Sequence, residues 1–411
     1  MAVETLDLTN PDNFDDGFPH AYFKHLRAHA PISFAPEPAG VNRVLGTDGP
    51  GPGFWVITRH ADVIHISKRP KLFSSYDGTN IPTLPPDQLA RLRTIMLNMD
   101  PPQHVKYRSL VRRGFTPRMI SGMEPHMREA SRAIVDQIAR KGECDFVTQV
   151  AAELPLIAIC ELMGVPVEDR HIIFDLSNRL IGFDDPEFQT SPEDAERASM
   201  EMWAYANSLG QKRRANPMQD LVTDLLQGEI DGDSLSELEF NNFFLLLAVA
   251  GNETTRNAIS GGLLALMEHR DQWDRLRRNP ALIDTAVDEI VRWGPPVMYF
   301  RRTATEDTEV SGTPIQAGDK LTLWYPSANR DEAVFPDGEV FDVGRRPNPH
   351  LGFGIGEHFC LGSHLAKLEI KSIFLELLAR LPDIELAGEP RRLHSNFIGG
   401  IKELPVSFTP E

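Results

Sequence analysis

The sequence has few cysteines, no excess of positive charge and no long hydrophobic run. Its 411 residues include three cysteines, Cys144, Cys160 and Cys360, an odd number too small for a disulfide framework, which favours a reducing, cytoplasmic setting. Asp and Glu outnumber Lys and Arg by 59 to 42. The resulting net charge of −17 argues against a nucleic-acid partner, because phosphates attract a basic surface.

Signals for export or membrane insertion are missing as well. The first 16 residues include five acidic residues and no Lys or Arg, which excludes the positively charged head of a secretory signal. The longest uninterrupted apolar run, Phe243 to Ala250, is far shorter than the ~20 residues of a membrane-spanning helix. We therefore expect a soluble protein with no membrane anchor.

What the sequence does contain is globular composition, 41% apolar and 25% charged. Its length permits one large domain or several of roughly 100–200 residues. Helical periodicity covers residues 119–139, 150–163, 192–214 and 361–381, whereas the strand patterns at 54–58, 308–310, 320–324 and 405–408 are short. With no repeat or linker, these patterns predict a mainly α (α+β) fold with a small β region, in a single domain over residues 1–411.

One predicted helix, residues 235–267, is apolar on all sides around Phe243 to Ala250 and should cross the centre of the protein. The residues directly after that run are Gly251, Asn252, Glu253, Thr254 and Thr255. A helical glycine costs about 1 kcal/mol and a carboxylate there would be buried, so these local violations indicate a functional site. An ordinary alternative stays open, in which Glu253 reaches the surface and Thr254 bonds the carbonyl one turn earlier.

The second unusual segment is 353–362, with the sequence FGIGEHFCLG. Its glycines permit tight turns and close approach to a flat ligand, and Cys360 directly precedes the helix predicted over 361–381. The helix dipole would stabilise a thiolate there, which suits a single bond to a haem iron. The glycine spacing does not fit a dinucleotide loop, and neither C-x-x-C nor H-E-x-x-H occurs to support zinc. A buried structural cysteine is the alternative, and it is our interpretation of Cys144 and Cys160.

With these segments the chain resembles the haem-thiolate monooxygenases of the cytochrome P450 family over nearly its whole length. Three family motifs, F-x-x-G-x-[RH]-x-C-x-G, A-G-x-[DE]-T and E-x-x-R with its partner arginine, are matched by Phe353–Gly362, Ala250–Thr254, and Glu289 and Arg292 with Arg345. Within the family, the resemblance is closest to bacterial members that oxidise steroids, methyl-branched lipids and terpenoids.

The resemblance implies the P450 fold, with the long central helix over a haem b group and the cysteine loop beneath it. Cys360 would be the iron ligand, and Phe353 would lie against the sulfur side of the porphyrin. The other residues at family positions around the haem, including those that would bind its two carboxylates, are His104, Arg108, Gly251, Arg302 and His358. The first two share a helical face because they are four residues apart, although each taken singly could be a surface charge.

Glu253 and Thr254 match the family's acid–alcohol pair, which supplies the protons for oxygen activation. Peroxide-using relatives lack this pair, so its presence favours a monooxygenase over a peroxygenase or a haem-based sensor. Glu289, Arg292 and Arg345 correspond to a charged triad whose role in the family is structural.

Family positions that face the substrate carry apolar or small residues here, which suits a small, neutral hydrophobic substrate such as a steroid, a methyl-branched lipid or a terpenoid. These residues are Thr79, Asn80, Ile81, Leu84, Leu246, Val249, Ala250, Val297, Met298, Tyr299, Phe397 and Ile398. Core packing is the alternative for all of them, and it is equally good for Leu246 and Ile398.

Electrons would come from NAD(P)H through a ferredoxin reductase and a ferredoxin. Residues 101–123 contain five basic residues and no acidic one: Lys106, Arg108, Arg112, Arg113 and Arg118. The resemblance places this segment on the cysteine side, where it would attract an acidic ferredoxin. A solvated helix face is the alternative.

Overall fold

The computed structural model describes residues 5–40, 49–181, 185–188 and 192–411. The helices are α1 (His20–His29), α2 (His60–Ser67), α3 (Pro86–Leu92), α4 (Gln103–Arg112), α5 (Pro117–Ile138), α6 (Glu153–Met163), α7 (Arg170–Ile181), α8 (Pro192–Ala215), α9 (Leu221–Gln227), α10 (Glu237–Glu268), α11 (Arg270–Arg278), α12 (Ile283–Trp293), α13 (Tyr325–Ala328) and α14 (Ser363–Arg380). The strands are β1 (Ile32–Ala35), β2 (Phe54–Ile57), β3 (Phe73–Ser74), β4 (Glu143–Asp145), β5 (Glu229–Ile230), β6 (Asp233–Ser234), β7 (Tyr299–Ala304), β8 (Thr308–Val310), β9 (Thr313–Ile315), β10 (Lys320–Trp324), β11 (Glu385–Leu386), β12 (Arg391–Arg392), β13 (Ile401–Glu403) and β14 (Pro405–Ser407).

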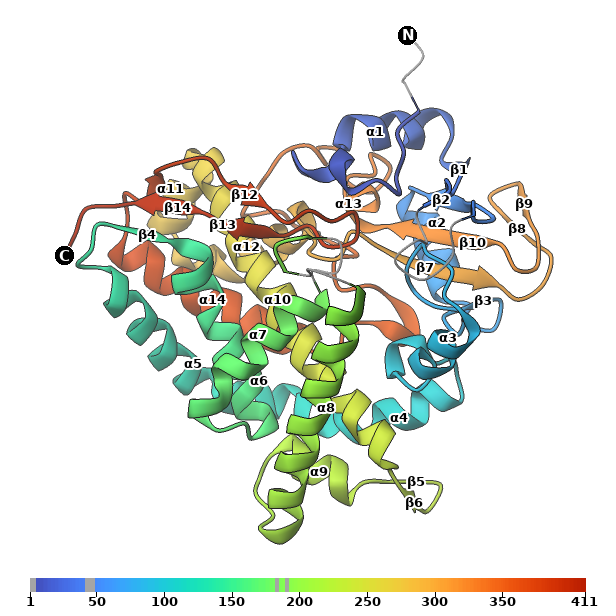
Figure 1. Ribbon diagram of the computed structural model, residues 1–411. Coiled ribbons are helices and arrows are strands. Elements are labelled where there is room, and N and C mark those ends of the chain that lie inside the picture. The colour runs from blue at the N-terminus through green and yellow to red at the C-terminus, as the bar shows by residue number, and fades with distance from the viewer. Residues whose placement is uncertain (1–4, 41–48, 182–184, 189–191) are drawn as a thin grey trace.

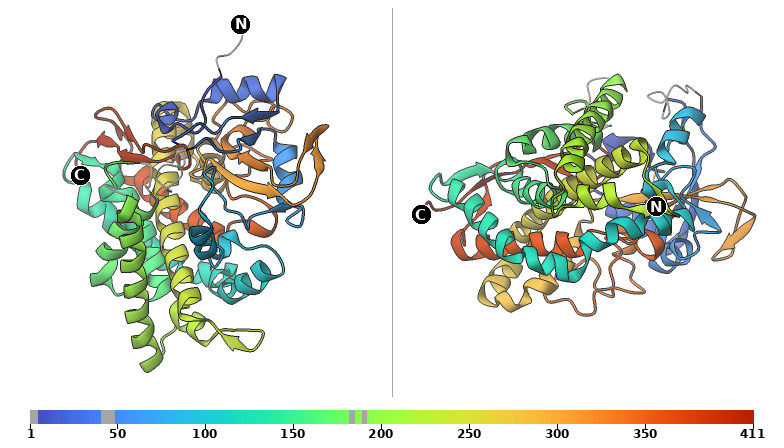
Figure 2. Two further views of the ribbon diagram at one scale, coloured as in Figure 1. Left: turned by 45° about the vertical axis from the view of Figure 1, so that its right-hand side comes forward. Right: turned by 90° about the horizontal axis from the view of Figure 1, so that it is seen from below.

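The helices make up most of the molecule, and the largest sheet lies to one side of them with α1 and α2 (Figure 1). Figure 2 shows from two further sides that α10 runs through the middle of the helical part. The mainly α fold with little β structure is therefore confirmed.

The predicted helices and strands correspond closely to observed elements. The four helical stripes appear as α5, α6, α8 and α14, and the four strand patterns appear as β2, β8, β10 and β14. The boundaries differ by at most three residues, and two of these differences have a visible structural cause. The start of the second stripe is a π-helical turn, Val147–Ala151, that precedes α6. The last helix starts at Ser363 rather than at Leu361, because Leu361 and Gly362 form a turn and Gly362 is the N-cap.

The largest sheet has the strand order β1-β2-β10-β7-β3. Strand β10 pairs with β2 in parallel and with β7 in antiparallel orientation, and Leu321 lies opposite Arg302 while Thr322 lies opposite Arg301. Because side chains alternate along a strand, Arg301 and Arg302 point to opposite faces of this sheet. The two faces consequently receive different buried cations.

Helix α10 organises the core. A capping box formed by Ser236 and Glu239 starts it, and its 32 residues span about 48 Å. It packs against α6, α7, α8, α12 and α14. A Cβ atom added at Gly262 would lie 2.7 Å from Ile290 Cγ2, so this glycine permits the close approach of α10 to α12.

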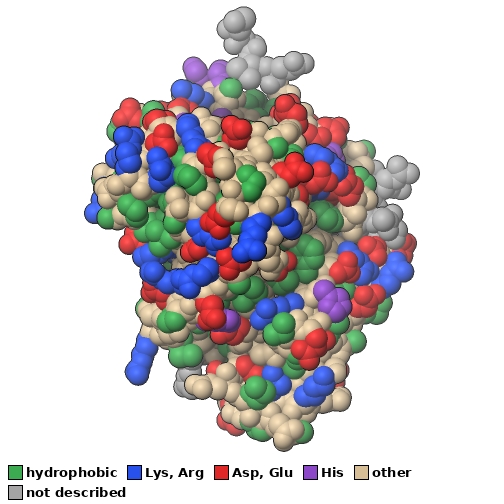
Figure 3. Space-filling model, turned by 90° about the vertical axis from the view of Figure 1, so that its left-hand side faces the viewer, with side chains coloured by type: hydrophobic (Ala, Val, Ile, Leu, Met, Phe, Trp, Pro, Cys, Tyr) green, Lys and Arg blue, Asp and Glu red, His purple; other side chains and the backbone are tan. Residues whose placement is uncertain are grey.

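Among the described residues, no helix is both long and apolar enough to cross a membrane. The surface is mixed in charge: Figure 3 shows Lys and Arg side chains interspersed with Asp and Glu side chains over one face of the molecule. On that face the excess negative charge is therefore not gathered into a single patch.

Candidate active site

On α10, the residues predicted to face the substrate keep solvent-accessible surface, although this helix runs through the middle of the helical part. Leu246, Val249 and Thr254 are partly exposed and Ala250 is exposed, whereas Phe244 and Ala248 have no accessible surface. The open residues are spaced three to four positions apart and so share one helical face. A solvent-accessible stripe on a helix in the middle of the molecule indicates a hollow beside it.

Glu253 and Thr254 sit on this helix, and the structure orients them differently. The Glu253 carboxylate is fully buried and forms an ion pair with Arg256, while Asn252 Nδ2 donates to Glu253 Oε1 at 3.4 Å. Burial raises the pKa of the Glu253 carboxyl group, and Arg256 opposes that shift. The Thr254 hydroxyl donates to the Ala250 carbonyl at 2.7 Å. The threonine thus makes the local bond of the ordinary alternative, whereas the glutamate does not reach the surface.

Gly251 lies where α10 packs against α6. A Cβ atom at this position would lie 2.8 Å from Ile159 Cδ1 on α6, closer than real Cβ contacts allow. The absence of a side chain therefore permits close packing of α10 on α6, and the contact of Gly251 with the cofactor stays a prediction.

The cysteine loop directly precedes the N-terminus of α14, and a backbone hydrogen bond within the loop stabilises it. The Cys360 amide donates to the Phe353 carbonyl at 2.8 Å. Gly354 and Gly356 have φ values of 68° and 81°, which are left-handed conformations that favour glycine. Since a Cβ at Gly356 would lie 2.4 Å from the Ser67 carbonyl oxygen, this loop also packs closely on the end of α2.

The surroundings of the Cys360 sulfur act on its pKa in opposite directions. Burial raises the pKa of the thiol, while the Gly362 amide and the Arg108 guanidinium favour the thiolate. Burial also raises the pKa of Cys144 and of Cys160 to about 12, and Lys141 and Arg170 respectively oppose these shifts. Both cysteines are buried free thiols, whereas Cys360 is partly exposed, which agrees with the structural role that the sequence suggested for Cys144 and Cys160.

Four groups that can carry positive charge converge beside this loop: His104 and Arg108 from α4, Arg302 from β7, and His358. The two imidazole rings have centroids 4.1 Å apart, and Arg108 Nη2 donates to the Phe359 carbonyl at 2.5 Å. Burial and the neighbouring arginines lower the pKa of His104 to about 4 and that of His358 well below its usual value.

This cluster has unmet capacity for hydrogen bonds to an anion. His104 is 1% exposed and its Nδ1 has no partner, while Arg302 is 5% exposed and Nη1 donates to the Arg301 carbonyl at 2.7 Å. Within the described ranges, none of the four residues forms an ion pair with a carboxylate. A buried Arg302 without an ion-pair partner among the described residues, beside hydrogen-bond donors from Arg108 and the two histidines, fits a ligand that brings its own carboxylates, as haem does.

The charged triad links α12 to the chain that leads into the cysteine loop. Arg292 Nε lies 2.7 Å from Glu289 Oε2, and Arg345 Nε lies 3.1 Å from the same oxygen. Glu289 also accepts hydrogen bonds from the Asp342 amide at 2.8 Å and from Asn348 Nδ2 at 3.1 Å. Every polar atom of the glutamate is engaged with protein, which leaves none for a substrate.

The residues predicted to face the substrate fall into two groups in the structure. Those with surface open to a hollow or to solvent are Asn80, Leu84, Leu246, Val249, Ala250, Val297 and Phe397. Those packed in the core are Thr79, Ile81, Met298, Tyr299 and Ile398, of which the last four are at most 3% exposed. Side chains alternate along an extended segment, so the neighbours Val297, Met298 and Tyr299 cannot all face one pocket.

Two of the core residues border a different cavity. A cavity of about 270 Å³ lies between the N-terminal segment, α10 and the C-terminal loop, and both Met298 and Ile398 line it. Their contact with the substrate stays a prediction.

The basic segment is less available than its sequence suggested. Lys106 forms an ion pair with Asp231 in the β5–β6 hairpin, and Arg108 is turned inward onto Phe359. Arg112 and Arg118 are exposed, whereas the side chain of Arg113 lies outside the described residues.

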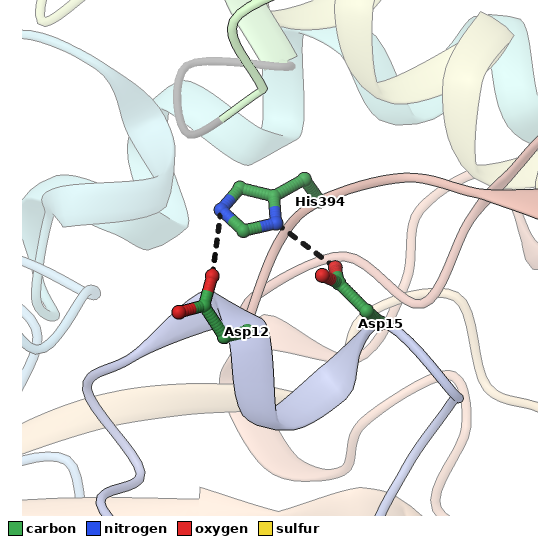
Figure 4. Close-up of side chains that lie close together, drawn as sticks. All are labelled: Asp12, Asp15 and His394. Atoms are coloured by element: carbon green, nitrogen blue, oxygen red, sulfur yellow. Dashed lines mark hydrogen bonds and ion pairs between the residues drawn. The ribbon is translucent and has the colours of Figure 1, made fainter.

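Outside the cysteine loop, one group of potential metal ligands occurs in the part of the chain that the structure describes: Asp12, Asp15 and His394 (Figure 4). His394 Nδ1 lies 2.9 Å from Asp15 and Nε2 lies 3.8 Å from Asp12, so the two ring nitrogens face different carboxylates. Since the side chains are partly or largely exposed, we interpret them as ion pairs that join the N-terminal segment to the C-terminal loop.

Sequence reasoning missed several buried polar residues around the site. Arg256 joins Glu253 to Asn178 of α7, whose Oδ1 accepts from Arg256 Nη1 at 2.7 Å. Ser75 lies 3.3 Å from His358 Nε2. The spacing of Glu253 and Arg256 is a helical ion-pair signal that could have been read, whereas the contact of Ser75 with His358 exists only in three dimensions.

Comparison with known proteins identifies relatives over the full chain. The family model for cytochrome P450 matches residues 53–385. The chain is 45% identical to a steroid C26-monooxygenase of Rhodococcus jostii (strain RHA1), over 98% of this chain and 85% of that protein. It is 44% identical to a methyl-branched lipid omega-hydroxylase of Mycobacterium bovis, over 100% of this chain and 96% of that protein.

A solved structure also matches closely. Cytochrome P450 CYP268A2 of Mycobacterium marinum, in complex with pseudoionone, superimposes with a TM-score of 0.92 at 39% identity over 99% of each chain. These matches confirm the resemblance stated from the motifs, the corresponding fold, monooxygenase activity and a haem-thiolate cofactor.

Proposed function

The chain belongs to the cytochrome P450 family, and from this premise we propose that it hydroxylates a neutral hydrophobic substrate with O₂ and electrons from NAD(P)H. A ferredoxin reductase and a ferredoxin would carry those electrons. The observation that carries the proposal is that the Cys360 loop lies beside two arginines and two histidines, none of which forms an ion pair with a carboxylate in the described part of the chain.

The residues fit haem b as the bound form. Cys360 would supply the axial thiolate, and His104, Arg108, Arg302 and His358 would bind the two propionates. When bound, the haem supplies the redox chemistry of oxygen activation. The chain contributes the dry pocket, the thiolate and the proton supply.

For the proton supply we propose that Glu253 and Thr254 act in sequence. Burial raises the pKa of the Glu253 carboxyl group and so favours its protonated form, while Arg256 stabilises the charged form after that proton leaves. The Thr254 hydroxyl already donates to Ala250. Its oxygen can accept a second hydrogen bond from an incoming donor, as a relay requires.

For the substrate we propose a steroid, a methyl-branched lipid or a terpenoid. The predicted substrate residues that retain accessible surface are apolar except for Asn80, which suits a neutral molecule. Two relatives are named for a steroid and for methyl-branched lipids, and the M. marinum structure holds pseudoionone. The three cysteines are free thiols, which supports a cytoplasmic setting for this reaction.

For electron entry we propose the cysteine side of the molecule. With Lys106 and Arg108 engaged in contacts within the protein, Arg112 and Arg118 are the exposed cations of the described segment that would attract an acidic ferredoxin. A double charge reversal at these two residues should slow reduction more strongly at low salt. An unchanged reduction rate at low salt would contradict docking on this surface.

The proposed function is tested by spectroscopy and turnover of the holoprotein. Reduction under CO should give the red-shifted Soret band of a thiolate-bound haem, and Cys360→Ala should abolish it. A panel of steroids, branched lipids and terpenoids should then include a compound that shifts the iron to high spin and is hydroxylated with NAD(P)H, ferredoxin reductase and ferredoxin. Turnover with hydrogen peroxide but not with reduced ferredoxin would instead identify a peroxygenase, and no spin shift with any compound would refute the substrate class.

A further inference from the structure

A short loop between β3 and α3 carries four of the residues predicted to face the substrate. Two buried cationic residues donate hydrogen bonds to the backbone carbonyl groups of this loop. The first is Arg301 of β7. The backbone amide of Arg301 donates to the Thr79 carbonyl at 2.7 Å. Nη1 of its side chain donates to the Asn80 carbonyl at 3.4 Å and to the Pro82 carbonyl at 3.3 Å. One residue therefore holds three carbonyl groups within a stretch of four residues.

The second cation is Lys320 of β10, and it binds the remaining carbonyl. Lys320 Nζ donates to the Ile81 carbonyl at 2.9 Å and to Glu37 Oε2 at 2.6 Å. Lys320 is 3% exposed and Glu37 is 2% exposed, so both charges have lost their water. All four carbonyls from residue 79 to residue 82 thus accept from two cationic residues.

The two cations lie on one face of the sheet. Thr303 lies opposite Lys320 in the β7–β10 ladder, and Arg301 is two residues before Thr303, which puts both cations on the same side. Arg301 Nη2 also donates to Thr303 Oγ1 at 3.1 Å. Arg302 points to the opposite face, toward the cationic cluster beside Cys360. Arg301 and Arg302, which are neighbours on β7, thus lie against two different parts of the site: the loop and the cluster beside Cys360.

Burying two like charges side by side opposes stability, because desolvation and mutual repulsion both disfavour them. Glu37 forms the ion pair with Lys320, Asp77 and Glu37 both favour the charge of Arg301, and the loop carbonyls complete the set of acceptors. A pair of apolar residues would pack this position at lower cost. Charged side chains occupy this position instead, and they donate hydrogen bonds to the backbone carbonyl groups of the loop.

We propose that Arg301 and Lys320, with Glu37 as counter-ion, form a buried clamp that sets the position of loop 79–82 and thereby the range of substrates that the pocket admits. They are positioning residues, since they reach the substrate through the loop. The inference rests on the proposed function, in which Asn80 and Leu84 of this segment border the substrate hollow. Because the clamp binds carbonyl groups, it acts on the loop whatever side chains the loop carries.

The clamp has a dependence on pH. Burial, with Arg301 adding repulsion, lowers the pKa of Lys320 to about 8, while Glu37 opposes the shift. Burial lowers the pKa of Arg301 to about 10, while Asp77, Glu37 and Tyr299 oppose that shift. Above pH 8 the ammonium group becomes neutral and its charge-assisted bonds to Glu37 and Ile81 weaken.

In the unfolded chain Lys320 retains its proton up to about pH 10.5, so this group makes the free energy of unfolding rise with pH between 8 and 10.5. The hold on the loop and the global stability therefore move in opposite directions over that range.

The test measures the loop and the substrate separately in the holoenzyme. In Lys320→Met, hydrogen exchange of the amides in residues 76–85 should become at least tenfold faster in the absence of substrate. Lys371→Met, which removes a lysine paired with Asp284 at 2.8 Å on the surface, serves as the matched control and should leave this exchange unchanged. Glu37→Gln should show the same direction as Lys320→Met with a smaller effect, and it supplies the test if the lysine variant does not fold.

The second measurement is the apparent Kd for the spin shift by the best substrate of the panel. It should rise at least fivefold in Lys320→Met while kcat at saturation and imidazole binding to the iron stay within twofold. Unchanged exchange in residues 76–85 overturns the clamp, even where the enzyme hydroxylates its substrate as proposed. Faster exchange in residues 76–85 with an unchanged Kd would refute the proposal that the clamp controls the substrate range. A wild-type Kd that is constant from pH 7 to 9.5 would refute the role assigned to the charge of Lys320.

Discussion

Glu289 offers a sharp test of how the chain behind the cysteine loop is held. The carboxylate and the Arg292 guanidinium both have no accessible surface, and they form two bonds of 2.7 and 2.8 Å. Glu289→Gln keeps the size of the side chain but removes the negative charge, so the arginine is left as a buried cation. Removing one partner of a buried ion pair costs about 3–5 kcal/mol, mostly because the remaining charge is uncompensated.

The other contacts of Arg292 limit this loss but do not cancel it. Its guanidinium donates to the carbonyls of Asn329, Gly338 and Val340 at 2.8–3.0 Å, and these neutral acceptors stay in place in the variant. We therefore expect a loss of about 3 kcal/mol, the lower end of that range. Since folded domains are stable by about 5–15 kcal/mol, a loss of this size removes a large part of the margin without preventing folding.

The assay is urea unfolding of the holoprotein followed by circular dichroism, with the haem-thiolate spectrum recorded on the same samples. Asp284→Asn on the same helix is the control, because its partner Lys371 lies 2.8 Å away and the aspartate side chain is 70% exposed. An exposed pair of this kind contributes at most about 1 kcal/mol. If Glu289→Gln loses no more than Asp284→Asn, the reasoning that buried charge pairing anchors this segment is wrong.

Three further outcomes follow from the site and its packing. Thr254→Ala should consume NAD(P)H at a normal rate but release peroxide in place of hydroxylated product, whereas Thr254→Ser should stay coupled; coupling measured as product per NAD(P)H that is equal in both would contradict the relay. Gly251→Val should destabilise the protein by about 1–3 kcal/mol, because even its Cβ would lie 2.8 Å from Ile159 Cδ1, and Ile159→Ala in the same chain should restore part of the loss in urea unfolding. Cys144 and Cys160, whose pKa burial raises to about 12, carry about one thiolate in ten thousand at pH 8 and should resist a thiol reagent in the native holoprotein until urea unfolds it; rapid labelling of either would contradict its burial.

The parts of the site that could be read from the sequence are those whose residues are neighbours in the chain. The Phe353–Gly362 motif carries its own turns and its cysteine, and residues 250–254 break helical rules within one turn of helix. The E-x-x-R spacing places Glu289 and Arg292 on one helical face, and the structure confirms that they pair. In these cases backbone geometry alone determines which side chains meet.

The sequence was a poorer guide wherever exposure decides the role of a residue. Met298 and Tyr299 follow Val297 directly and are equally apolar, yet they are packed in the core while Val297 stays partly open. Lys106 looked like a free surface cation, but Asp231 from a distant hairpin pairs with it. Neither outcome leaves a local signal, since each depends on what another part of the chain places alongside.

By itself, then, the sequence determined the family and the mainly α fold and predicted the residues that carry the chemistry, because motifs, periodicity and charge pattern are properties of short segments. Only the tertiary structure decided how these segments are held: that Glu253 pairs with Arg256, that two arginines and two histidines gather beside Cys360, and that Arg301 and Lys320 donate hydrogen bonds to the backbone of loop 79–82. The physical reason is desolvation. The energy of a buried charge depends on every group packed around it, and those groups come from segments far apart in the chain.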